Sequence, residues 1–153
     1  HNKTQQNTPK HTKGHQKIKV FVQEKSGDVR LVSEKSVRVV AIPNPKVYLG
    51  GKTAQCKRLK LPKGLIQVQT GIYLQLDGFH FDLNYRVTDF DFRLVRNGKT
   101  IFSQPTHGNR FTSEMREQID ALKTGDVIFI FDVRTNCPSG KGFVLDGLEI
   151  EVE

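Results

Sequence analysis

The chain has 153 residues, of which 36% are hydrophobic and 26% charged, enough for one domain of ordinary size and an extension. No run approaches the ~18 apolar residues of a bilayer-spanning helix, and the N-terminus lacks an apolar signal core. The formal charge of +8 is uneven, because residues 1–63 carry a net +12 and residues 64–153 a net −4. A first residue of His rather than Met indicates a processed or truncated chain.

Residues 1–16 form a polar, basic segment without acids or apolar periodicity, which we expect to be a disordered tail. Such basic sequence admits salt-screened contacts with nucleic acid, anionic lipid or polyanionic glycan, although a solvated extension is the simpler interpretation. Residues 18–22 and 29–32 are short β-like runs around a turn signal, and residues 36–42 predict a further strand. Residues 17–42 therefore resemble the closing strands of a module, too few to build a core alone.

Residues 43–52 form the expected connector. Pro43 and Pro45 fix φ and favour extended neighbours, so this part is predicted to be a stiff strut. Gly50 and Gly51 follow and permit the chain to turn. These four residues are the predicted hinge, and residues 53–153 the domain beyond it.

Within that domain, apolar and polar side chains alternate imperfectly over residues 64–76 and predict a strand. Gly71 is expected at a bulge or a close-packing point. Residues 79–95 alternate aromatic and polar side chains at the strand period, but the phase slips by one residue at Asp89. Because such a slip exchanges the two faces of a strand, we expect a bulge or bend near Thr88 and Asp89.

The C-terminal part shows the clearest local signals. Asn97-Gly98 predicts a type I′ hairpin turn, and residues 112–122 predict a helix capped by Thr112 or Ser113 and stopped at Gly125. Residues 126–132 form a strongly apolar central strand, residues 138–140 a turn, and residues 143–152 one or two closing strands. One short helix among about seven strands indicates a mainly β, antiparallel sandwich.

Cys56 and Cys137 are far apart in the sequence and lack zinc-binding spacing. A disulfide in an oxidising compartment and two unrelated thiols both remain open.

The sequence shows no catalytic constellation. A copper site at His1 would need a rigid N-terminus, which the tail expected to be disordered does not supply. His80 and His107 are interpreted as surface or loop residues. Three acids near the expected bulge are most simply turn and edge residues: Asp82, Asp89 and Asp91. The aromatics alternate with acids, which disfavours nucleic-acid binding. We therefore expect no enzyme activity, cofactor or metal.

Five segments carry a family resemblance: residues 42–52 (IPNPKVYLGGK), 70–82 (TGIYLQLDGFHFD), 108–112 (GNRFT), 124–126 (TGD) and 145–150 (LDGLEI). In order and spacing they resemble the C-terminal periplasmic domain of the gliding-motility and type IX secretion family GldM, called PorM in secreting relatives. The resemblance implies an immunoglobulin-like β-domain at the end of an elongated dimeric shaft. That shaft crosses the periplasm from an inner-membrane motor to an outer-membrane-associated ring of a lipoprotein and its partner.

The family's transmembrane helix and helical domain do not occur in this sequence, so a C-terminal fragment and a free-standing relative are both expected forms. The resemblance implies a non-enzymatic periplasmic interaction domain, and it adds a homodimer to the expected assemblies. The predicted contact residues lie in two loops, 104–111 and 136–142: His107, Asn109, Arg110, Phe111, Ser139 and Lys141. The alternatives are a secreted or periplasmic carbohydrate- or polyanion-binding module that uses the basic half, and a copper-dependent oxidative enzyme that uses His1.

Overall fold

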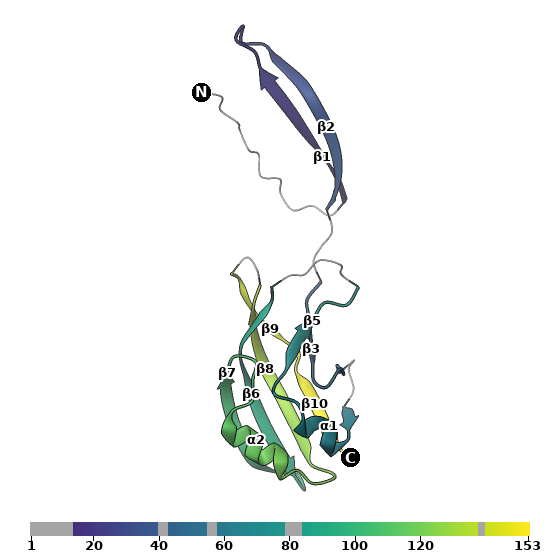
Figure 1. Cartoon of the computed structure of the whole chain (residues 1–153), viewed down its shortest axis with the longest axis vertical. Coiled ribbons are helices and arrows are strands. Elements are labelled where there is room, and N and C mark those ends of the chain that lie inside the picture. The colour runs from purple at the N-terminus through teal and green to yellow at the C-terminus, as the bar shows by residue number, and fades with distance from the viewer. Residues whose placement is uncertain (1–13, 40–42, 55–57, 79–83, 138–139) are drawn as a thin grey trace. The chain divides into compact units, whose positions relative to one another are not determined.

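The computed structural model describes residues 14–39, 43–54, 58–78, 84–137 and 140–153 (Figure 1). The chain divides into two compact units, residues 1–42 and residues 43–153.

The first unit is an antiparallel hairpin of β1 (Gly14–Gln23) and β2 (Val29–Val39). Its turn is closed by the Glu24 N–H, which donates to the Asp28 carbonyl at 2.8 Å, as the predicted turn requires. The expectation of separate strands at 29–32 and 36–42 is wrong within the described residues, because β2 runs unbroken to Val39. The polar stretch at Ser33–Ser36 stays in the strand because its backbone pairs with β1.

A six-stranded sheet dominates the second unit. Its strands follow the order β4-β10-β8-β6-β7, with β9 paired to β8, so the predicted apolar strand is central. The pairs are antiparallel except β10 with β4, which is parallel and departs from the expected all-antiparallel arrangement. The bounds are β4 Leu59–Leu61, β6 Arg86–Arg96, β7 Lys99–His107, β8 Val127–Asn136, β9 Gly142–Leu145 and β10 Leu148–Val152.

A smaller layer completes the sandwich. It contains the two-stranded sheet of β3 (Lys46–Tyr48) and β5 (Tyr73–Gln75), with α1 (Lys63–Gln67) and α2 (Ser113–Asp120). Buried side chains from all four elements or their flanks join those of the large sheet in one hydrophobic core. The mainly β sandwich expected from the sequence is confirmed, with two short helices where one was expected.

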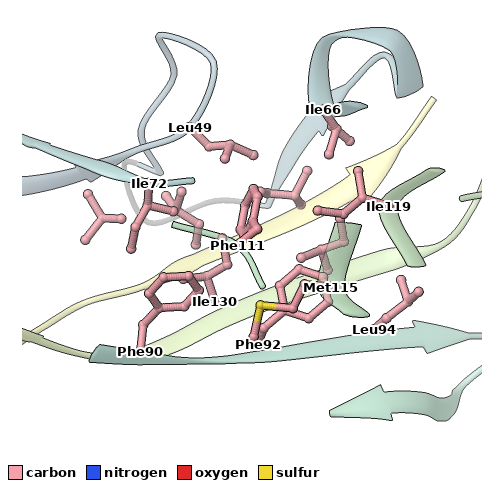
Figure 2. Close-up of a cluster of buried hydrophobic side chains, with 14 of the residues drawn as sticks. Leu49, Ile66, Ile72, Phe90, Phe92, Leu94, Phe111, Met115, Ile119 and Ile130 are labelled. Atoms are coloured by element: carbon pink, nitrogen blue, oxygen red, sulfur yellow. The ribbon is translucent and has the colours of Figure 1, made fainter. Parts of the chain in front are cut away.

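The core is centred on β6. Phe90, Phe92 and Leu94 are fully buried there, on the face that the sequence phase predicts after the slip. Figure 2 shows them rising from β6 toward Phe111 and Met115. The Phe111 ring lies edge-on to Phe90 and Phe92, with centroid distances of 6.1 and 5.9 Å.

The predicted bulge is confirmed. The register between β6 and β8 shifts on both sides of Asp89, the residue at which the sequence phase slips. The earlier part of the predicted strand, residues 79–83, lies outside the described residues. At the other end of β6, Asn97 and Gly98 have φ values of 51° and 76°, which confirms the type I′ turn.

The strand predicted over residues 64–76 is wrong for its first half, where α1 forms instead. Leu65 and Ile66 both pack on the core although they are adjacent, which a helix allows and a strand does not. Pro62 suits this start because it precedes the first turn, where its missing N–H has no partner to lose. The second half is confirmed only as the short β5.

The helix α2 forms as the sequence predicts. The Thr112 hydroxyl caps it by accepting from the Met115 N–H at 3.2 Å, and Glu114 occupies the first turn. The predicted stop is wrong, because the helix ends at Asp120 with Ala121 as its C-cap, and Gly125, whose φ is 88°, lies in the turn that leads to β8.

Candidate functional site

The two loops predicted to contact a partner leave the large sheet near the start of β6. His107, the last residue of β7, pairs with Asp89, and Asp89 also pairs with Arg134 of β8. Asn136, which ends β8, pairs with Arg86 at the first position of β6. The topology therefore brings loops 104–111 and 136–142 to the same end of one sheet.

An ion pair and a hydrogen bond stabilise the bulge at Asp89. The Arg134 guanidinium pairs with the Asp89 carboxylate, which also accepts from the Thr88 hydroxyl at 2.8 Å. These bonds, with a smaller contribution from His107, lower the pKa of Asp89 below its ordinary value. Asp89 is thus an ionised, paired carboxylate, and Asp82 lies outside the described residues.

The loop predicted over residues 104–111 is shorter than expected, because residues 104–107 belong to the end of β7. Backbone and side-chain hydrogen bonds join this segment to the smaller layer. The Asn109 backbone carbonyl accepts from the Ile72 N–H at 2.9 Å, and the Asn109 side-chain Nδ2 donates back to the Ile72 carbonyl at 3.1 Å. The Thr106 hydroxyl donates to the Arg110 carbonyl at 3.0 Å. Gly71 bridges to Arg110, which confirms the predicted close-packing point. Hydrogen bonds therefore fix the position of the loop on the smaller layer of the sandwich.

The predicted contact residues differ in accessibility. The side chains of His107, Asn109 and Arg110 are exposed, whereas Phe111 is only 7% exposed and belongs to the core. The Phe111 N–H donates to the Thr70 carbonyl at 2.9 Å, and this bond fixes the residue against the smaller layer with its side chain turned inward.

In the second loop, Lys141 is exposed and its carbonyl accepts from the Cys137 N–H at 3.0 Å. Ser139 lies outside the described residues. Cys137 is half-buried at the end of β8, but Cys56 also lies outside the described residues, so their pairing stays an open prediction. A contact role for the exposed members of both loops likewise stays a prediction.

The predicted hinge residues have defined places in the second unit. Pro43 is exposed and Pro45 is buried. Gly50 and Gly51 have φ values of 54° and 77° in a turn closed by reciprocal backbone hydrogen bonds of Leu49 and Lys52, at 2.9 and 3.0 Å. The segment expected to be a connector thus supplies β3 and a tight turn to the second unit.

The hairpin leaves most of its apolar surface exposed. Seven of its large apolar side chains are each at least 45% exposed in the structure: Ile18, Val20, Phe21, Val22, Val29, Leu31 and Val32. The sequence signal was two apolar runs rich in valine, and the further strand predicted from residue 36 continues β2 as far as Val39, so it does not cover them. A two-stranded ribbon this apolar needs a further surface to be stable in water.

Two further kinds of feature are absent from the described residues. No group of three or more His, Cys, Asp or Glu side chains there could hold a metal ion. None of the helices in the described ranges is long and apolar enough to cross a membrane.

The second unit is thus a mainly β sandwich whose loops are tied to its core. A family model described as the GldM C-terminal domain matches residues 42–153, a range that begins one residue before this unit. The chain belongs to the GldM C-terminal domain family, which relates it to gliding motility and type IX secretion. No curated protein matches the chain.

Proposed function

We propose that this chain supplies a non-enzymatic, periplasmic interaction domain of a gliding and type IX secretion machine. In this proposal it contacts an outer-membrane-associated ring and transmits force or conformation through protein contacts. The observation that carries the proposal is the family match over residues 42–153, which coincides with a unit built on one continuous core.

Loop anchoring supports the contact role. The exposed side chains of His107 and Arg110 project from a backbone held by hydrogen bonds to Ile72, Thr70 and Thr106. A partner that binds such a loop loses less conformational entropy than one that must first order it. The buried Phe111 beneath the loop would also resist displacement under load.

The test is capture of the ring lipoprotein and its partner by the immobilised 153-residue chain. We expect the double variant His107→Ala/Arg110→Ala to weaken capture at least roughly tenfold, since a few central residues dominate most interfaces. Lys99→Ala is the matched control, because Lys99 is an exposed cation at the opposite end of the same strand. Absence of capture by the wild-type chain, or equal loss with Lys99→Ala, would refute the proposal.

We further propose that β1 and β2 are the last strands of a preceding β module, whose other strands cover the apolar hairpin. Hydroxyl-radical footprinting of Phe21 and Leu31 tests this in the native protein against the 153-residue chain. Protection in the native protein is expected, and equal labelling in both would count against a covering module.

A further inference from the structure

A compact group of polar and aromatic side chains lies on the outer face of the small sheet. β3 and β5 lie side by side (Figure 1), and Tyr48 pairs with Tyr73 while Lys46 pairs with Gln75. Directly paired residues share a face of a sheet, so these four side chains lie together. Val47 and Leu74 take the opposite face and pack on the core. We call the four residues and Asp77 the tyrosine platform.

The two tyrosine rings form the apolar part of the platform. They stack with a centroid distance of 5.5 Å and an interplanar angle of 22°. Tyr73 remains 41% exposed, so one of the rings offers accessible surface to a ligand. Stacking also restricts both rings before any ligand arrives, which lowers the entropic cost of binding.

A hydrogen-bonded pair of charges forms the polar rim. The Tyr48 hydroxyl donates to Asp77 Oδ1 and Lys46 Nζ donates to Asp77 Oδ2, each at 2.8 Å. The Lys46 and Asp77 side chains stay 45% and 41% exposed. Each therefore keeps accessible hydrogen-bonding capacity, and the exposed Gln75 amide adds a donor and an acceptor beside them.

We propose that the tyrosine platform binds an uncharged saccharide chain. A pyranose ring has an apolar C–H face that suits the electron-rich face of an aromatic ring, and a hydroxyl edge that suits the polar rim. Lys46 and Asp77 neutralise each other, so the platform has no net charge to select an ionic ligand. Protein hot spots instead favour aromatic anchors in desolvated pockets, which this open sheet face does not resemble.

This inference does not depend on the proposed contact loops, because none of the platform residues belongs to residues 104–111 or 136–142. Failure of one therefore leaves the other standing. Loop variants should keep saccharide binding, and platform variants should keep capture of the ring proteins.

The experiment is an NMR titration of the ¹⁵N-labelled 153-residue chain with chitohexaose and laminarihexaose, and with a heparin hexasaccharide as the anionic comparison. We expect shift changes at residues 46–48 and 73–77 with a neutral probe. Tyr73→Ala should weaken that binding roughly tenfold, and Tyr73→Phe should retain it, because the ring supplies the contact. Val144→Ala is the matched control, since Val144 is an exposed apolar residue on β9.

Tyr48→Phe is the second variant and keeps the ring while removing the hydroxyl that holds Asp77. It should weaken binding by a smaller factor, and thermal unfolding confirms that each variant is folded. The proposal is overturned if neither neutral probe shifts the platform, if Tyr73→Ala binds normally, or if heparin binds there more tightly. Loss of ring-protein capture by Tyr73→Ala without any saccharide binding would instead mark a protein interface and overturn it as well.

Discussion

At the scale of single residues, Gly71 sets how closely the small layer approaches the 104–111 loop. A Cβ at this position would lie 2.0 Å from the Asn109 carbonyl oxygen and 2.7 Å from Arg110 Cα. Both neighbours are backbone atoms, so no side-chain rotation can relieve the overlap. We expect Gly71→Ala to lower the free energy of unfolding by about 2–3 kcal/mol, measured by urea denaturation.

Gly64→Ala is the control for this prediction. Gly64 lies in α1 and has no heavy atom near its hypothetical Cβ within 4 Å, so alanine there should be neutral or slightly stabilising. Equal effects at the two glycines would mean that close packing at Gly71 is not what the fold requires.

A second residue-scale prediction concerns the ion pair of Arg96 and Asp126. Arg96 Nε and Nη2 donate to the two Asp126 carboxylate oxygens at 2.8 and 2.6 Å, and Asp126 is only 1% exposed. Asp126→Asn leaves the guanidinium without its charge partner and should cost about 3 kcal/mol at pH 7. Urea denaturation measures this, with the exposed Glu117→Gln as control.

The same pair predicts a pH dependence. The Arg96 hydrogen bonds, helped by the Lys123 N–H, lower the pKa of Asp126 in the folded state despite its burial. A depressed carboxyl pKa adds stability above the unfolded pKa of about 3.9, and this is lost as pH falls through the folded value. The stability gap between wild type and Asp126→Asn should therefore be constant above about pH 5 and shrink in more acidic solution. A gap that widened on acidification would contradict this assignment.

At the scale of elements, α2 depends on its cap. The Thr112 hydroxyl accepts from the Met115 N–H and also donates to Gln104 Oε1, at 3.2 Å each. Thr112→Ala should cost about 1 kcal/mol in thermal or urea unfolding, and Thr112→Ser should recover most of it. If serine were no better than alanine, the capping hydroxyl would not be the source of the loss.

At the scale of the whole molecule, the two units of the chain differ in whether they bury a hydrophobic core of their own. Residues 43–153 contain the described buried hydrophobic core, whereas the described hairpin exposes most of its large apolar side chains. We expect removal of residues 1–42 to change the unfolding midpoint of the sandwich by only a few degrees. A peptide of residues 14–39 should show a largely coil circular dichroism spectrum. A markedly less stable truncated chain would contradict this division.

Much of the fold followed from short-range patterns. The phase slip at Asp89 predicted the bulge, Asn97-Gly98 predicted the turn, and Thr112 predicted the cap, because each signal lies within a few residues. The α1 helix was missed because a five-residue helix offers too few turns for a periodic signal. The continuity of β2 was missed because its middle residues are polar, and only their pairing with β1 keeps them in the strand.

The candidate sites were less predictable. The turn-rich composition of residues 104–111 predicted a loop, but residues 104–107 extend β7, and the inward position of Phe111 depends on the distant Phe90 and Phe92. The tyrosine platform could not be anticipated, because Tyr48 and Tyr73 are 25 residues apart and meet only through the pairing of β3 with β5. Local sequence does not specify which short strands become neighbours.

By itself the sequence determined the mainly β class, the turns, the bulge, the α2 cap and the family resemblance, since these depend on residue type and near-neighbour spacing. Only the tertiary structure decided the parallel pairing of β4 with β10, the anchoring of the 104–111 loop through Ile72, and the stacking of Tyr48 on Tyr73. These features join segments far apart in the chain, and burial of the shared core selects among the pairings that local propensities leave open.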